Sequence, residues 1–149
     1  MRPYKVYAIE EGVVIDHIPE RKSLKILEIL GLSTTHDSLI TLGINLDSSK
    51  MGHKDVLKIE NKELSKEELD KISLVAENAS VSLIKDHKVI EKVQISVPST
   101  VEGIIKCGNA KCITNNQPVV TVFEKISSKP LKMKCHHCEK VFSKEDLVF

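Results

Sequence analysis

The four cysteines of this 149-residue sequence fall into two close pairs, a pattern typical of a metal site. Cys107 and Cys112 form the first pair, and Cys135 and Cys138 form the second. Two short-spaced pairs let four thiolates converge as a tetrahedron, which is the geometry that structural Zn²⁺ prefers. Four sulfurs leave no position for a water molecule, so the spacing predicts one structural zinc ion per chain and not a catalytic one.

Other interpretations of the cysteines stay open at this point. They could be unrelated buried thiols, or disulfide-bonded, although nothing in the sequence indicates an oxidising compartment. A rubredoxin-like iron site has similar spacing, and zinc is only the commoner occupant. His136 and His137 lie inside the second pair, but because four cysteines fill the shell we expect them to face solvent or to lie behind the ligands.

The rest of the sequence lacks the motifs of an enzyme. It contains no nucleophile motif, no Gly-rich phosphate loop and no His-Glu-x-x-His helix. Asp16 and His17 could form half of an acid–base pair, but no nucleophile accompanies them. Lys54, Lys58 and Lys92 lie on or beside predicted strands, where they could hold a polyphosphate or simply solvate an exposed face.

Composition and charge exclude several classes of protein. A content of 41% hydrophobic and 29% charged residues is typical of a globular protein, and no segment approaches the length of a membrane span. Residues 1–98 hold 14 basic and 16 acidic residues, and residues 99–149 hold 8 and 5. Neither half is basic enough to indicate a nucleic-acid partner. Because no signal peptide is apparent, we expect a cytoplasmic protein without a nucleic-acid or membrane partner.

Hydrophobic periodicity predicts alternating strands and helices in the first two thirds of the chain. Asp16–Pro19 is expected to break the first strand, and Pro19 to open a helix over residues 20–30 that buries Leu24, Leu27 and Leu30 before Gly31 caps it. Ser65 and Glu68 form a capping box that starts a second helix. Strands are expected at residues 4–9, 12–15, 40–46, 56–60, 81–84 and 89–97.

This order of elements predicts an α+β fold: a ferredoxin-like antiparallel sheet with two helices on one face. We place a domain boundary after Pro98. Residues 99–149 are too few to build a comfortable core alone, so metal binding should supply folding energy to a small β-rich domain. Its short strands are expected at residues 119–123, 131–134 and 140–142.

Several blocks of the sequence resemble the regulatory chain of aspartate carbamoyltransferase. They are GVVIDHIP at residues 12–19, ITLGINL at 40–46 and MGHKDVLKIEN at 51–61. The pattern around the cysteines, Cys107-x₄-Cys112-Ile with Cys135-x₂-Cys138-Glu-Lys-x-Phe142, is similar to the zinc domain of that family. The resemblance covers essentially the full chain, in the right order.

The resemblance implies a non-catalytic regulatory subunit in pyrimidine biosynthesis. Residues 1–98 would be an allosteric domain that binds CTP and ATP, with UTP acting beside CTP in some members. Residues 99–149 would be a zinc domain that docks onto the catalytic chain. Regulatory chains would pair as dimers, and three dimers would bridge two catalytic trimers. Without the resemblance, a zinc-ribbon assembly adaptor or a nucleic-acid-binding module is the alternative.

The resemblance also implies a nucleotide site. Base contacts would come from the backbone, the ribose would meet Asp16, and the phosphates would meet Lys92. The full set of implied residues is Ala8, Ile9, Val14, Asp16, His17, Lys58, Ser82, Ile84, Val89 and Lys92. The sequence departs from the family pattern at Ser82, where asparagine is common, at His87, where tyrosine is common, and at His53, where arginine is familiar. Ser82 can still donate one hydrogen bond, with shorter reach.

Overall fold

The computed structural model describes residues 9–32, 37 and 39–149. The chain forms two compact units that divide between Ser96 and Val97. Ala8 and most of the strand expected at residues 4–9 lie outside the described residues. Among the described helices, none is long and apolar enough to cross a membrane.

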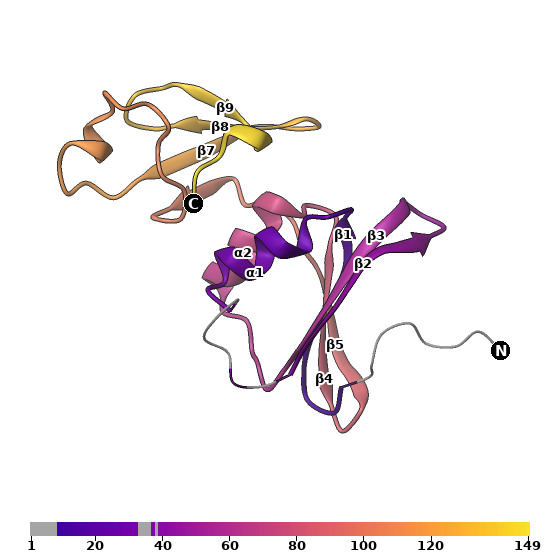
Figure 1. Cartoon of the computed structure of the whole chain (residues 1–149). Coiled ribbons are helices and arrows are strands. Elements are labelled where there is room, and N and C mark those ends of the chain that lie inside the picture. Colours follow the sequence, from indigo (N-terminus) through magenta and orange to yellow (C-terminus); the bar gives the residue numbers. More distant parts are fainter. Residues whose placement is uncertain (1–8, 33–36, 38) are drawn as a thin grey trace. The chain divides into compact units, whose positions relative to one another are not determined.

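The first unit is an antiparallel five-stranded sheet with two helices on one face (Figure 1). The elements are β1 Gly12–Pro19, α1 Ser23–Ile29, β2 Ile40–Ser48, β3 Gly52–Glu60, α2 Lys66–Val75, β4 Ser80–Lys85 and β5 Lys88–Gln94. The strand order is β2-β3-β1-β4-β5. The first four strands and both helices give the ferredoxin-like arrangement that the sequence predicts, and β5 extends it by one edge strand.

Alternation along the strands separates the two faces of this sheet. Val13, Ile15, Leu57 and Ile59 are buried, as are Ile26 of α1 and Ile72 of α2. The residues between them on β1 and β3, such as Val14 and Lys58, are only half-buried. Because successive strand side chains point to opposite faces, one face forms the core beneath the helices and the other stays open.

Helix α2 confirms the capping prediction. The Ser65 side chain accepts a hydrogen bond from the Glu68 N–H, while the Glu68 carboxylate accepts one from the Ser65 N–H. Gly31, with φ +68°, ends α1 as predicted: its N–H donates to the Glu28 carbonyl, and the Leu32 N–H donates to the Leu27 carbonyl. This pair of bonds is the Schellman arrangement, which needs a left-handed residue such as glycine.

The prediction for the start of α1 is wrong in two respects. β1 does not break at Asp16 but continues to Pro19, because His17, with φ +59°, forms a bulge that absorbs one extra residue. The helix then begins at Ser23 and buries Ser23 and Ile26, whereas Leu24 is 57% exposed. Both the N–H and the hydroxyl of Ser23 bond to buried Asp55, which turns that side of α1 toward the sheet.

The second unit is a four-stranded antiparallel sheet in the order β6-β7-β8-β9. Its elements are β6 Thr100–Glu102, the 3₁₀ turn η1 Ile113–Asn115, β7 Val122–Ser128, β8 Leu131–Cys135, β9 Val141–Ser143 and η2 Lys144–Asp146. Phe123 and Met133 are fully buried, and the ring of Phe142 packs against Phe123 with centroids 6.1 Å apart. The sequence missed β6 and placed β7 a few residues too early.

Candidate functional site

The second unit brings the four cysteine sulfurs together. All four Sγ atoms lie within 4.8 Å of one another. The Sγ atoms of Cys107 and Cys138 are 3.6 Å apart, and those of Cys112 and Cys135 are 3.8 Å apart. A tetrahedral Zn²⁺ with bonds of about 2.3 Å to sulfur requires edges of about 3.8 Å, so the cluster has the size of a zinc site.

Short loops at the ends of the strands position these cysteines. Cys107 follows the bridge between Lys106 and Val148, and Cys112 immediately precedes η1. Cys135 ends β8, and Cys138 lies in the turn before β9. Each sulfur accepts a hydrogen bond from the backbone N–H two residues further along, which comes from Asn109, Thr114, His137 and Lys140 respectively.

The thiols differ in how readily they ionise. Burial raises the pKa of Cys107 to about 12. Burial also acts on Cys138, but bonds from the Lys140 backbone and the Asn109 side chain outweigh it and lower that pKa to about 7. Four crowded thiols cannot all lose their protons without a nearby cation, so a divalent ion must displace the last protons when it binds. The hydrogen bonds that the sulfurs already accept then stabilise the thiolates around the ion.

The two histidines between Cys135 and Cys138 have other partners. His136 Nδ1 lies 2.9 Å from a Glu124 carboxylate oxygen, and His137 Nε2 lies 3.1 Å from the Val120 carbonyl oxygen. Both residues are exposed. The candidate metal ligands in the described part of the chain are therefore the four sulfurs, and a closed shell of this kind is typical of structural sites.

The first unit aligns several of the implied nucleotide residues across its open face. The strand register pairs Thr41 with Lys58, Lys58 with Val14, Val14 with Ser82, and Ser82 with Lys92. We call this row of five residues, one from each strand, the lysine rung. Paired residues of antiparallel strands point to the same face, and strand spacing of about 4.8 Å puts the Lys58 and Lys92 backbones roughly 14 Å apart.

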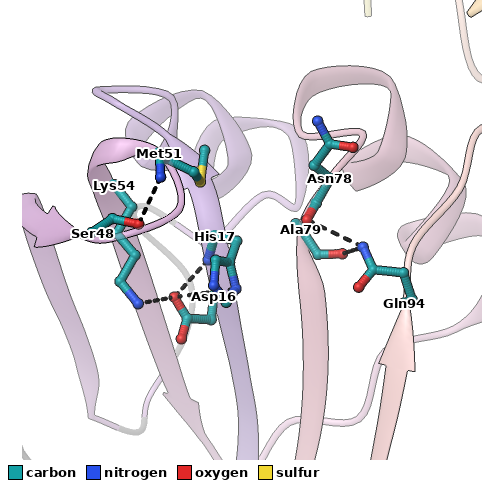
Figure 2. A network of polar contacts seen from close by, with 8 residues as sticks. All are labelled: Asp16, His17, Ser48, Met51, Lys54, Asn78, Ala79 and Gln94. Carbon is teal, nitrogen blue, oxygen red and sulfur yellow. Dashed lines mark hydrogen bonds and ion pairs between the residues drawn. The ribbon is translucent and has the colours of Figure 1, made fainter.

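An anionic residue lies beside the lysine rung on β1. Asp16 forms an ion pair of 2.9 Å with Lys54 and accepts a 2.6 Å hydrogen bond from the His17 N–H (Figure 2). Partial burial raises the pKa of Asp16, but these bonds outweigh it and hold the pKa below its ordinary range. Burial lowers the pKa of Lys58, and the charge of Asp16 partly offsets that effect.

The bulge of β1 places His17 at the rim of a cavity. This cavity has a volume of about 450 Å³ and is lined by His17, Lys54, Gly52 and residues 47–50 of the β2–β3 turn. Figure 2 shows His17, Asp16 and Lys54 gathered next to Ser48 and Met51 of that turn. The cavity therefore has two lysines in its lining, Lys50 and Lys54, and His17 at its rim is three residues along the chain from Val14 of the lysine rung.

The residues implied for base contacts gather at the β4–β5 hairpin. Ile84 pairs with Val89, and Gly12 of β1 pairs with Ile84. The His87 N–H donates to the Glu10 carbonyl, which ties the hairpin to the segment that contains buried Ile9. Ile9 thus approaches this end of the sheet, and Ala8 lies outside the described residues.

A second carboxylate of the first unit, Asp55, lies in the core. Asp55 is fully buried and accepts hydrogen bonds from Ser23, from the Asn45 N–H at 3.1 Å and from the Arg21 backbone. Burial raises the pKa of this carboxyl, but the bonds outweigh it and lower the pKa. The alternation of Asp55, Leu57 and Ile59 on one face of β3 was the signal that could have revealed it.

Comparison with known proteins finds one family for both units. Residues 4–96 match the family described as aspartate carbamoyltransferase regulatory chain, allosteric domain, and residues 99–148 match its metal binding domain. Aspartate carbamoyltransferase regulatory chains from Pyrococcus abyssi and Pyrococcus horikoshii are 49% and 50% identical to this chain, each over 99% of this chain and 98% of the relative. The one from Thermoplasma volcanium is 45% identical over 96% of this chain and 95% of the relative.

These matches cover both units, and the metal binding domain coincides with the part of the chain where the four sulfurs meet. The chain therefore belongs to the family of aspartate carbamoyltransferase regulatory chains.

Proposed function

We propose that the open face of the first unit binds CTP and ATP, and UTP beside them, as allosteric effectors. As a member of its family the chain is a non-catalytic subunit of an enzyme of pyrimidine biosynthesis. The lysine rung is the observation that carries the proposal. Two lysine side chains that leave the same face from backbones about 14 Å apart can converge on a triphosphate bound between them.

Each implied residue then has a role that fits its place. Lys58 on β3 and Lys92 on β5 attract the phosphates, and Ser82 lies between them on β4. Asp16 accepts from ribose hydroxyls and His17 lies beside the phosphates. Val14 lines the pocket, and the backbone of Ala8, Ile9, Ile84 and Val89 recognises the base. The cavity beside His17 supplies room for the anionic tail.

The metal in this proposal is one structural Zn²⁺, held by Cys107, Cys112, Cys135 and Cys138. Four sulfurs with tetrahedral spacing suit zinc, which is also the commoner occupant of such sites. The bound ion supplies folding energy to residues 99–149 and takes no part in a reaction. Exposed apolar side chains on this unit support a docking role onto the catalytic chain; they are Ile113, Val120, Ile126, Val141 and Val148.

Regulation follows as linkage between the two sites. Regulatory chains pair through residues 1–98, where Leu24, Leu39 and Ile44 are exposed apolar residues that support self-association. Three such dimers bridge two catalytic trimers in the cytoplasm. A nucleotide biases the trimers only to the extent that its affinity differs between the two arrangements of the complex.

Calorimetric titration of the zinc-loaded chain with CTP, followed by ATP, tests the effector site. We expect one competitive site per chain. We expect Lys92→Ala to weaken CTP binding about 10- to 150-fold, because a bond to a charged group contributes about 1.5–3 kcal/mol. Lys88→Ala, at an exposed lysine on the same strand, is the matched control. Unchanged CTP affinity in Lys92→Ala would refute the assigned site.

Mixing experiments test the docking role. We expect Cys112→Ala to abolish assembly with catalytic trimers, because the second unit loses its metal, while the far-ultraviolet circular dichroism of the two helices stays unchanged. Native gels and metal analysis measure both effects. Normal assembly of Cys112→Ala would contradict the zinc-dependent docking.

A further inference from the structure

The loop that holds the first pair of cysteines is fixed by its own side chains. The Asn115 amide donates to the carbonyl oxygens of Cys107 and Asn109, at 2.8 Å each. The Asn116 amide donates to the Cys112 carbonyl at 2.9 Å. These bonds cross the loop on both sides of η1, so the residue between Ile113 and Asn115 is held in one place.

That residue is Thr114, and it contacts a metal ligand directly. Its hydroxyl Oγ1 donates a hydrogen bond of 3.3 Å to Cys112 Sγ, and its backbone N–H donates to the same sulfur. Thr114 is half-buried, so this bond is partly shielded from water. A hydrogen bond to an ionised acceptor is stronger than a neutral one, and shielding strengthens it further.

A shell of four thiolates around a divalent ion carries a net charge of −2, which must be stabilised by nearby donors. The backbone N–H groups do this for all four sulfurs. The Thr114 hydroxyl adds a further donor. Because this donor belongs to a side chain, a substitution at Thr114 can remove it and leave the backbone donors in place. The hydroxyl also fixes the direction of the Cys112 side chain toward the other three sulfurs.

We propose that Thr114 is a positioning residue for the metal, whose hydroxyl orients Cys112 Sγ, draws charge from it and slows loss of the ion. The proposal rests on the assignment of a metal to the four cysteines and adds a residue to it. Outer partners of metal ligands typically change metal affinity by about 10–100-fold when they are removed.

Three variants of the full chain separate this role from simple packing. Thr114→Val keeps the branched shape and removes the hydroxyl, whereas Thr114→Ser keeps the hydroxyl and removes the methyl group. Thr100→Val makes the same chemical change at an exposed residue, the first of β6 in the same unit. We expect Thr114→Val to bind Zn²⁺ about tenfold more weakly in competition with a chelator. Thr114→Ser and Thr100→Val should stay near the wild type.

A spectroscopic measurement on the Co²⁺-loaded chain gives a readout that packing does not move. Removing the hydroxyl leaves Cys112 Sγ richer in electrons, so the sulfur-to-cobalt charge-transfer band of Thr114→Val should move to longer wavelength. Thr114→Ser should restore the wild-type band. An unshifted band and wild-type zinc affinity in Thr114→Val would overturn the role of Thr114, as would equal losses in Thr114→Val and Thr114→Ser. A wild-type chain that binds neither ion would instead refute the metal site itself.

Discussion

Replacing buried Asp55 by asparagine tests how the first unit is held together. The carboxylate accepts from the Ser23 N–H at 3.2 Å, from the Ser23 hydroxyl, from the Asn45 N–H at 3.1 Å and from the Arg21 backbone. An asparagine can accept on one oxygen only, and its NH₂ group must face backbone donors. With at least one charge-assisted bond lost and one donor unpaired, we expect a loss of about 3 kcal/mol in the free energy of unfolding.

Urea unfolding at pH 7, followed by circular dichroism at 222 nm, measures this loss. Both α-helices in the described part of the chain belong to the first unit, so the signal reports that unit. With an m-value of about 2 kcal/mol/M, the midpoint should fall by about 1.5 M. Asp37→Asn makes the same chemical change at an exposed residue and should leave the midpoint unchanged.

The pH dependence gives a second test of the same carboxylate. Because the pKa of Asp55 is lowered in the folded chain, its stabilising contribution is complete well above the ordinary value and is lost as the pH falls through the folded value. The difference in the free energy of unfolding between the wild type and Asp55→Asn should therefore be constant near neutral pH and become smaller below about pH 4. Equal midpoints of the two proteins at pH 7 would refute the reasoning.

Three further perturbations test other parts of the structure. Ser65→Ala removes the capping box of α2 and should cost about 1 kcal/mol in urea unfolding; a loss no larger than that of exposed Ser99→Ala would contradict the cap. Phe123→Ala should destabilise the second unit by about 3–5 kcal/mol in thermal unfolding of the metal-loaded chain, because it empties the core beside Phe142. Removing the metal with a chelator should abolish the amide protection of β7 and β8 while leaving that of β1 and β3, and equal loss in both units would show that they do not fold separately.

The sequence predicted those elements whose cause is local. The bonds between Ser65 and Glu68, and the left-handed cap at Gly31, depend on residues a few positions apart, so the pattern alone was sufficient. The clustering of the four cysteines could be predicted for a similar reason, because metal coordination restricts the spacing of its ligands in the sequence. The resemblance to a known family then supplied residues on separate strands that no local pattern connects.

What the sequence could not predict depends on contacts between distant elements. Asp16–Pro19 looks like a strand end, but the bulge at His17 is matched by a second bulge at Asn45, and both lie opposite the same part of β3. The register across β3 sets that geometry. In the same way, the rotation of α1 is set by Asp55, which is 32 residues from Ser23 in the chain. The spacing of the leucines therefore predicted a buried Leu24, which is exposed.

The place of Lys92 in the sheet has a consequence for the order of events when a ligand arrives. β5 is an edge strand, and every one of its residues is exposed. Its C-terminal end is held by Gln94, whose amide donates to the carbonyls of Asn78 and Ala79 (Figure 2). Edge strands of this kind detach at lower free energy than the strands beside them. A ligand that binds Lys92 stabilises the form in which β5 is paired with β4, and it does not stabilise the form in which β5 is detached. Occupancy of the open face would then appear as slower amide exchange along β5, so the strand itself reports whether the site is filled.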